Sequence, residues 1–535
     1  MASGEGRSEG SIQPASRRRI RALARALLLL PLLAPLHCGL ERHDEILILV
    51  NEESPVSLAI GAYYSESRGI PKTNILRLSI PATPADERSK LGPFEIISAE
   101  GFAELVRAPV EAHLREHDLV DAIEIIVTTK GIPLRVEGPA APLDTWLRDA
   151  ASAAVDAELS LLFSDLIGRA GIQDAVNPYF DSTLGFHEFR KRNPEAPLRY
   201  LVARLTGYQD ELDPETGIPR DIRALIDGAQ AESAAPAVAS TWLVDLDPSL
   251  TLGSASGNVV LLQPTAAILR AAGLAVTFNE ERAMAHDVKN IAGYASWGSN
   301  DNHDPGPPYY GEIAGKLRPG SFAPRALSVD LVSTNARTFT NPPHYGQSLV
   351  ADLLRMGVSG AAGHVVEPVL AAVPRPQILL RRYAQGVPAV EAFYRSIPYL
   401  GWMNVYIGDP LMRIAEPISA RDPSDLDGDG VDNDSDNCTA IPNPDQRDTN
   451  ADGFGNACDA DIDGNGVVTT SWGFSFPLKE RGDIEWIALT ATNGPYDPNH
   501  DLDGDGKVDR LDVSIAQLFL FLPPGPSGQA TPPRR

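Results

Sequence analysis

Aspartate loops near the carboxyl end constrain the folding of this chain more than any other feature. Residues 421–465 contain thirteen aspartates and no glutamate, against two basic residues, Arg421 and Arg447. So many carboxylates in a short segment repel one another unless cations lie among them. The segment also has few apolar residues from which to build a core. We therefore expect its fold to depend on bound cations rather than on hydrophobic burial.

The spacing of the aspartates matches that of calcium-binding loops. An EF-hand-type loop takes oxygen ligands from positions 1, 3, 5, 7, 9 and 12 and needs glycine at position 6 for a sharp turn. Residues 501–512 meet every requirement, although Asp512 replaces the usual glutamate at position 12. Lys507, at position 7, contributes only its backbone carbonyl. The spacing therefore predicts a Ca²⁺ site in this loop.

Three further loops of the same kind precede this one. They begin at Asp425, Asp448 and Asp461, and the first two of them carry an acid at position 12. The loop at Asp461 has Trp472 there, so it is expected to be weak or to borrow an oxygen from elsewhere. An acidic disordered linker is the alternative, but four closely spaced loops favour the metal. The expected Ca²⁺ ligands are Asp425, Asp427, Asp429, Asp436, Asp448, Asn450, Asp452, Asn456, Asp459, Asp461, Asp463, Asn465, Asp501, Asp503, Asp505, Lys507, Asp509 and Asp512.

The net charge and the cysteines indicate the environment of the protein. A net charge of −25 argues against nucleic acid as a partner, because phosphates would be repelled. Two of the three cysteines, Cys438 and Cys458, flank one aspartate loop. This placement fits a disulfide formed in an oxidising compartment, with two free thiols in a cytosolic chain as the alternative. We expect a secreted protein or one at the cell surface.

The first 38 residues have the pattern of an export signal. Five arginines between residues 17 and 25 form a positive region, and residues 26–36 are apolar but too short to span a bilayer. Cys38 raises the alternative of a lipoprotein, but the residues before it fit such a signal poorly. We expect residues 1–38 to be a signal peptide. No other segment is long and apolar enough to predict a transmembrane helix.

Residues 44–416 alternate short apolar runs with amphipathic runs. This alternation predicts an α/β domain with a mainly parallel sheet flanked by helices. Strands are expected at residues 46–50, 74–78, 122–128, 200–203, 239–244, 275–278, 291–296, 326–332, 360–365 and 404–407. Helices are expected at residues 54–68, 103–116, 221–231, 265–272, 347–356, 377–383 and 389–395. Residues 139–197 are predicted to be a largely helical insertion, with its clearest helix at 151–163.

Polar residues follow several of these strands, where an open parallel sheet collects its binding sites. They include Asn51, Lys130 and Asp409, each of which has an ordinary alternative as a cap or turn residue. If the strand ends converge on one cleft, that cleft contains candidate catalytic residues. These candidates are Ser296, Asp301, His303, His364 and Glu367.

Five stretches of the α/β region resemble an uncharacterised family of exported bacterial proteins found in genomes with the PEP-CTERM sorting system. The matching stretches are residues 50–55, 63–64 with 68–71, 129–133, 296–300 and 406–410. No activity is established for that family, so the resemblance implies a fold and an export route but no reaction.

A more distant similarity is to gingipain-type cysteine peptidases of the caspase-like fold, which also end in a strand followed by Gly-Asp-Pro. In that family a histidine after one strand and a cysteine after the next form the catalytic dyad. The corresponding stretches here, residues 293–298 and 330–334, contain neither a histidine nor a cysteine. Because a thiolate mechanism needs a thiol, cysteine peptidase activity is not expected.

The aspartate-rich region carries two further resemblances. Residues 421–465 resemble thrombospondin type 3 repeats, which wrap an irregular chain around a row of Ca²⁺ ions. Residues 461–525 resemble a dockerin, in which two calcium half-sites are each followed by a helix. The dockerin resemblance implies an interaction module with a cohesin-like or other protein partner. Residues 526–535 are rich in proline and glycine and are expected to be a disordered tail.

Three hypotheses follow from these observations. The first is a secreted calcium-binding protein with a non-catalytic, peptidase-like α/β domain and a calcium-dependent interaction module. The second is a hydrolase of unknown specificity that uses the candidate catalytic residues. The third places the protein in an extracellular polysaccharide-degrading assembly, although no glycosidase carboxylate pair is recognisable.

Overall fold

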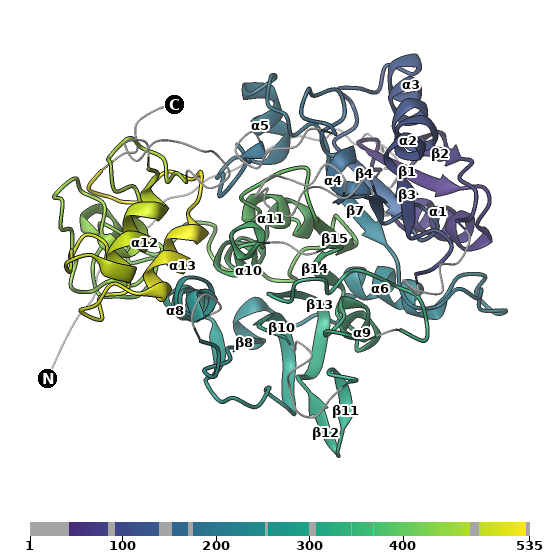
Figure 1. Ribbon diagram of the computed structural model, residues 1–535. Coiled ribbons are helices and arrows are strands. Elements are labelled where there is room, and N and C mark those ends of the chain that lie inside the picture. The colour runs from purple at the N-terminus through teal and green to yellow at the C-terminus, as the bar shows by residue number, and fades with distance from the viewer. Residues whose placement is uncertain are drawn as a thin grey trace, which may run out of the picture. The chain divides into compact units, whose positions relative to one another are not determined.

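A computed structural model of the chain describes residues 42–83, 91–137, 152–168, 175–251, 255–298, 307–343, 345–366, 369–470 and 481–530. The expected signal peptide, residues 1–38, lies outside these ranges. Ten strands form the main sheet, in the order β2-β1-β4-β7-β15-β14-β13-β10-β8-β9 (Figure 1). Their bounds are β1 Ile46–Asn51, β2 Ile75–Leu78, β4 Ile125–Thr129, β7 Leu201–Leu205, β8 Thr241–Asp245, β9 Ala275–Asn279, β10 Val288–Ser296, β13 Gly320–Asp330, β14 Gly360–His364 and β15 Asn404–Gly408. All ten expected strands are confirmed.

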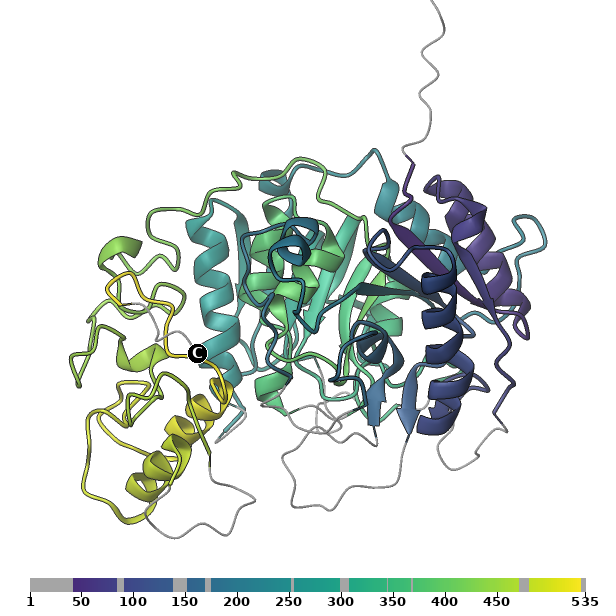
Figure 2. The ribbon, with the colours of Figure 1, turned by 90° about the horizontal axis from the view of Figure 1, so that it is seen from above.

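The sheet is covered on both faces. Along β1, Ile46, Ile48 and Val50 point into one hydrophobic cluster, whereas Leu47 and Leu49 point into another. Successive side chains of a strand alternate between faces, so a run of five apolar residues requires cover on both sides. Helix α1 (Pro55–Ser67) contributes to the first cluster and α3 (Ala108–Glu116) to the second, and Figure 2 shows helices on either side of the sheet.

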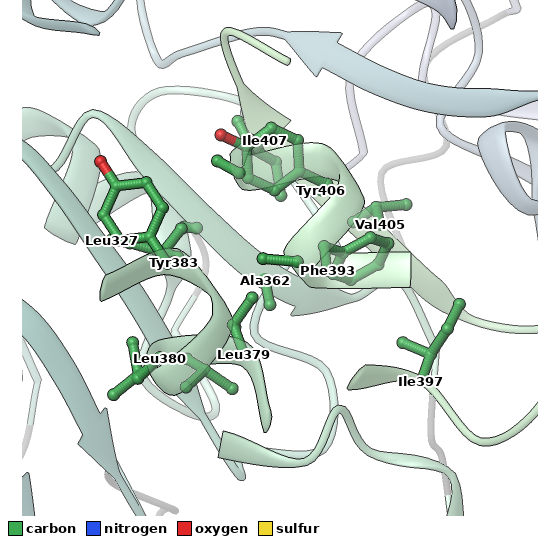
Figure 3. Packing of buried hydrophobic residues seen from close by; sticks show 14 of the residues in the cluster. Leu327, Ala362, Leu379, Leu380, Tyr383, Phe393, Ile397, Val405, Tyr406 and Ile407 are labelled. Carbon is green, nitrogen blue, oxygen red and sulfur yellow. The ribbon is translucent and has the colours of Figure 1, made fainter. Parts of the chain in front are cut away.

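Most of the remaining helices pack on the strands at the positions expected from the sequence. Helices α10 and α11 lie against the middle of the sheet, where Phe393 of α11 approaches Tyr406 of β15 with ring centroids 5.9 Å apart (Figure 3). Side chains such as Leu379 and Tyr383 of α10 belong to the same cluster. The bounds of these helices are α6 Arg220–Gln230, α7 Ala255–Gly257, α8 Gln263–Ala271, α9 Val350–Arg355, α10 Pro376–Ala384 and α11 Ala389–Ser396.

Two runs of parallel strands share one carboxyl edge. Strands β2, β1, β4 and β7 pair in parallel, and so do β14, β13, β10, β8 and β9. Strand β15 lies between the runs and is antiparallel to β14 over five residue pairs. Its bridge to β7 is the single pair Ile407–Arg204, which is parallel, and one pair is too short to set the direction of a strand. The Lys130 Nζ, just after β4, donates at 3.1 Å to the carbonyl of Phe339, in the loop after β13. This contact places the ends of both runs on the same side.

The predicted helical insertion is largely wrong within its described parts, residues 152–168 and 175–197. Strand β6 (Ser152–Ala154) and the short helix α4 (Val155–Leu159) replace the long helix expected at residues 151–163, and α5 (Phe186–Arg192) is the other helix. β6 joins β3 (Ile96–Ser98) and β5 (Arg135–Glu137) in a small second sheet. Ala153 to Leu162 is almost entirely buried, and periodicity cannot separate a buried strand from a buried helix.

Several short strands and helical turns elsewhere were not predicted from the sequence. The hairpin of β11 (Gly311–Ile313) and β12 (Lys316–Arg318) was not expected, and the helix expected at residues 103–116 begins with α2 (Ala99–Phe102) and a π-turn at Ala103–Arg107. Strands of three residues carry too little pattern to be recognised.

The described part of the aspartate-rich region is irregular, as expected. It contains two single 3₁₀ turns, η8 (Asn433–Ser435) and η9 (Asn456–Cys458), and two helices, α12 (Asp483–Asn493) and α13 (Arg510–Leu518). Residues 526–530, expected to be disordered, instead bond to the repeats: the Gly528 N–H donates to the Asp436 carbonyl at 2.8 Å and the Ser527 hydroxyl to Gly453 at 2.6 Å. The composition correctly indicated irregular backbone but not these partners.

Candidate metal centre

The first aspartate loop gathers its carboxylates around one point. One oxygen from each of Asp425, Asp427 and Asp429 lies within 4.8 Å of the others. Asp425 also fixes the turn, because its two oxygens accept the backbone N–H groups of Gly428 at 2.7 Å and Gly430 at 3.0 Å. Both glycines have positive φ, 76° and 96°, which explains why the turn requires glycine.

Two carboxylates of this loop are buried with an oxygen that has no hydrogen-bond partner among the described residues. Asp427 and Asp436 are both 0% exposed, and the Oδ2 atom of each is unpaired. Burial, with the neighbouring charges of Asp429 and Asp436, raises the pKa of Asp427 to about 8. Such groups are costly unless an opposite charge satisfies them. A hard divalent cation with oxygen ligands fits this donor set, and Ca²⁺ accepts the flexible geometry of such loops.

The second loop repeats the turn of the first, although its aspartates are not among the groups of three described residues that meet within 4.8 Å. Asp448 accepts the N–H of Ala451 at 2.7 Å and of Gly453 at 2.9 Å, as Asp425 does in its own loop. Burial raises the pKa of Asp459, at position 12, to about 7. Asn450 and Asp452, expected ligands at positions 3 and 5, are joined by a 2.9 Å hydrogen bond.

Asn456, expected as a ligand at position 9, also closes its loop. Its Oδ1 accepts the Thr449 N–H at 2.9 Å and its Nδ2 donates to the Pro498 carbonyl at 2.6 Å. Asn433 holds the same position in the first loop and accepts the Leu426 N–H at 2.8 Å. Sequence reasoning missed this bracing role, although the repeated asparagine at one position of both loops was a visible signal.

The third loop acquires a carboxylate from a distant residue. One oxygen from each of Asp461, Asp463 and Asp483 lies within 4.8 Å of the others, and Asp483 is 0% exposed. Asp483 is the first residue of α12, and Trp472, the residue at position 12 by spacing, lies outside the described residues. Asp483 therefore supplies the oxygen from outside the loop that we expected because Trp472 occupies position 12. Spacing could not identify Asp483, because an intervening segment displaces it from position 12.

Around Asp461 the local geometry follows the same plan. The N–H groups of Asn465 and Gly466 donate to its two oxygens at 3.1 Å and 2.5 Å. The Asp483 Oδ2 accepts the Thr469 N–H at 2.7 Å, so the helix start is tied to the loop. Burial raises the pKa of Asp461 to about 6 and also raises the pKa of Asp483.

The fourth loop brings together only some of its expected ligands. Asp501, Asp503 and Asp512 meet within 4.8 Å, and burial raises the pKa of Asp503 to about 6. Asp509 instead caps α13, accepting the Leu511 N–H at 2.7 Å. Asp505 accepts the Lys507 ammonium at 3.0 Å and faces solvent. The expected ligands thus divide into a converging group and residues that shape the loop.

A disulfide closes the repeats. Cys438 and Cys458 are bonded, 20 residues apart in sequence, and both are buried. This confirms the pairing expected from their position beside an aspartate loop. The bond substitutes for the hydrophobic core that this segment lacks.

The candidate catalytic residues are only partly described. Asp301, His303 and Glu367 lie outside the described residues. Ser296 and His364 end β10 and β14, with β13 between them, and both are buried. The His364 Nδ1 lies 2.9 Å from the Val332 carbonyl, and burial lowers the pKa of this histidine to about 4. It is therefore a neutral interior histidine at physiological pH.

Other strand-end residues have structural roles. Asn51 is 0% exposed and its Nδ2 donates to the carbonyls of Ile80 at 2.9 Å and Gly131 at 3.0 Å, which ties three loops together. Asp409 does not share the carboxyl edge, because β15 runs against β14. It accepts the hydroxyl of Tyr64 at 2.8 Å and the guanidinium of Arg68, near the end of α1. Asp409 therefore lies away from any cleft formed by the other strand ends, and its ordinary alternative, a structural role, holds.

A cavity of about 360 Å³ lies at the carboxyl edge of β1, β4 and β7. Its wall includes Lys130, Arg204 and Glu95, and all three are engaged with protein partners. Lys130 pairs with Asp210 at 2.8 Å, and the Arg204 guanidinium pairs with the buried Asp156. A cavity at the carboxyl edge of the strands is what this sheet architecture predicts. The charged side chains in its wall, however, already form ion pairs or hydrogen bonds with other residues of the protein.

Comparison with known proteins supports the calcium assignment. Residues 423–446 and 447–470 each match the model of the thrombospondin type 3 repeat. A search of curated proteins found no match. Repeats of this type bind calcium and are typical of extracellular proteins, and the aspartate clusters at residues 425–429 and 461–463 fit Ca²⁺ sites. Within the described ranges, no helix has the length and apolarity needed to cross a bilayer.

Proposed function

We propose that this calcium-binding protein is secreted and that its α/β domain serves recognition or surface display rather than catalysis. The unpaired, fully buried oxygens of Asp427 and Asp436 are the observation that carries the calcium part of the proposal. The first, third and fourth loops then each hold one Ca²⁺ through the converging carboxylates described above, with Asp483 completing the third. The second loop is proposed to hold one as well, because it repeats the turn of the first. The disulfide between Cys438 and Cys458 supports an oxidising, extracellular environment.

The α/β domain, taken as residues 44–416, is proposed to have a peptidase-like architecture without a peptidase dyad. Both cysteines within the described residues are bonded to each other, so neither supplies a thiolate nucleophile. His364 is buried, uncharged and held by a backbone carbonyl. These features support a binding role for the sheet edge rather than acid–base or thiol chemistry.

The segment from residue 461 to 525 is proposed to be a dockerin-like, calcium-dependent interaction module. Two loops, each followed by a helix, support this proposal: α12 follows the loop at Asp461 and α13 follows the loop at Asp501. Trp486 and Tyr496 are 43% and 54% exposed and offer aromatic surface on this module. Aromatic side chains are common at the centres of protein interfaces.

Calorimetric titration of Ca²⁺ into the purified chain tests the central proposal. We expect saturable uptake with affinities on the order of 10⁻⁴ to 10⁻³ M, as in extracellular modules. Asp427→Asn should weaken Ca²⁺ uptake at the first loop, because it removes the charge of a buried carboxylate ligand. Asp434→Asn is the matched control: it removes the same charge from an exposed residue of the same loop. Equal titration curves for the two variants, or no uptake at millimolar Ca²⁺, would overturn the proposal.

A further inference from the structure

The fourth calcium loop is continuous with a helix that packs on the α/β domain. Asp512, an expected ligand, lies in the first turn of α13 and is 1% exposed. Its Oδ1 accepts the Leu502 N–H at 2.7 Å and its Oδ2 accepts the Asp509 N–H at 2.8 Å. Any change in the loop therefore acts directly on the start of this helix.

The other end of α13 is held by residues of the α/β domain. The Arg375 guanidinium donates to the carbonyl of Leu518, the last residue of the helix, at 2.6 Å. The Tyr399 hydroxyl donates to the carbonyl of Leu520. Arg375 is 5% exposed and has no carboxylate partner among the described residues, so the carbonyl end of α13 is the counterpart of its charge. A cation is favourable at a helix carboxyl terminus.

Apolar packing accompanies these bonds. Leu522 forms a small buried cluster with Ala371, Ala372, Trp402 and Met403. The apolar residues along and just after this helix, Ile515, Leu518, Phe519 and Leu522, are all at most 9% exposed. The apolar face that they form is therefore buried against the chain itself instead of being open to a partner.

The beginning of the aspartate region is attached to the same part of the domain. The Gln385 amide, just after α10, donates to Asp422 at 2.6 Å. The guanidinium groups of Arg381 and Arg382 lie 3.8 Å and 3.6 Å from the same carboxylate. Both ends of the region thus meet the neighbourhood of α10, and the calcium loops lie between the two attachments.

We propose that Ca²⁺ bound at residues 501–512 locks α13 onto the α/β domain, so that the order of residues 369–375 and 399–403 depends on calcium. We call residues 501–522 the calcium clamp. The proposal rests on the calcium binding proposed above and adds a consequence for the α/β domain. Without the ion, the carboxylates of the loop repel one another, α13 loses its fixed start, and the contacts of Arg375, Tyr399 and Leu522 go with it.

The effect extends to the start of β15. The Asn404 Nδ2 donates to the Ala372 carbonyl at 2.9 Å, and Ala372 packs against the clamp. Asn404 pairs across the sheet with His364. Loss of the clamp would therefore loosen β15, the strand that lies beside His364. A protein partner that binds the apolar face of α13 would first have to displace the α/β domain from that face.

Hydrogen exchange measured by mass spectrometry on the full chain, with calcium and with chelator, tests the clamp. At Ca²⁺ a hundredfold above Kd, exchange in residues 510–522, 369–375 and 399–403 should slow by about 100-fold relative to the calcium-free chain. Residues 46–51, in the core of the first strand run, serve as the internal reference and should not respond. A response in 510–522 without one in 369–375 and 399–403 would overturn the clamp while leaving calcium binding intact.

The variant Leu522→Ala distinguishes Ca²⁺ binding at residues 501–512 from the effect of that binding on the α/β domain. This variant should still take up Ca²⁺ in calorimetry, with an affinity that is at most modestly lower because docking and binding are coupled, but it should lose most of the calcium response at residues 369–375. Asp512→Asn should lower the response at both places, and Asp434→Asn, which removes an equal charge outside the clamp, should leave it unchanged. A full calcium response of residues 369–375 in Leu522→Ala would contradict the proposal, and absence of calcium uptake by the wild type would defeat the proposed function as well.

Discussion

The sheet and the aspartate region reach order by opposite physical routes. In β1, five successive apolar residues are 0–1% exposed and divide between two hydrophobic clusters. In the loop at Asp425, the fully buried side chains include Asp427 and Asp436, and the Oδ2 atom of each has no hydrogen-bond partner among the described residues. The first region gains stability by removing apolar surface from water, whereas the second needs an ion to make its burial tolerable. A single chain can therefore contain one part that is indifferent to calcium and another that depends on it.

Removal of calcium should give the largest difference between the two regions. At Ca²⁺ a hundredfold above Kd, each site contributes about 2.7 kcal/mol, so four such sites would contribute about 11 kcal/mol to the folded aspartate region. Chelation should unfold this region at a much lower temperature and leave the strands β1 and β4 ordered. Calorimetric scans with and without chelator, read alongside exchange in residues 46–51, would measure this. A single unfolding transition that shifts as a whole on chelation would contradict the proposed difference between the two regions.

Truncation of a side chain in the core of the sheet should destabilise the α/β domain and should do so independently of calcium. Leu49 is 0% exposed in the cluster that α3 covers, so Leu49→Ala should lower the free energy of unfolding of the α/β domain by about 2–5 kcal/mol. The loss should be the same with and without calcium, because no aspartate loop touches this cluster. Urea unfolding in both conditions checks it. A calcium-dependent loss would show that the two regions are less independent than the contacts indicate.

Loss of the disulfide should matter most when calcium is absent. The bond closes a loop of about 20 residues, which corresponds to about 3 kcal/mol of chain entropy in the unfolded state. We expect the double variant Cys438→Ser, Cys458→Ser to need more Ca²⁺ for half-maximal ordering of the repeats. Circular dichroism during a calcium titration measures the shift. An unchanged midpoint would assign the order of the repeats to the ions alone.

The smallest expected effect concerns pH and the α/β domain. Burial raises the pKa of Asp330 to about 7 from its usual 3.8, although Asn335 and Tyr310 donate hydrogen bonds to it. Because the folded-state value is the higher one, the associated stability is complete below about pH 4 and is lost as the pH rises through 7. Asp330→Asn should therefore flatten the decline in unfolding free energy between pH 5 and pH 8. Urea unfolding at both pH values, in saturating calcium, measures this; an equally steep decline in the variant would assign it to other groups.

The order of strands and helices could be predicted from the chain because each run carried its own period. The helix expected at residues 54–68 begins where predicted, and the hydroxyl of Ser54 caps α1 by accepting the Ser57 N–H. The predicted insertion failed at residues 151–163 because burial there is uniform and leaves no period to read. Sequence alone thus determined the α/β class and the positions of the aspartate loops, since both depend on spacing along the chain.

Only the tertiary structure decided which distant groups meet. It placed Asp483 beside Asp461, set Asp409 at the edge opposite the other strand ends, and joined Arg375 to the end of α13. Each of these contacts joins residues far apart in sequence, and no local period encodes such a distance. The aspartate spacing determined that ions are needed, because like charges repel over short stretches of any chain. The packing of α13 decided where the stability gained from those ions is transmitted, because that depends on which surface the helix covers.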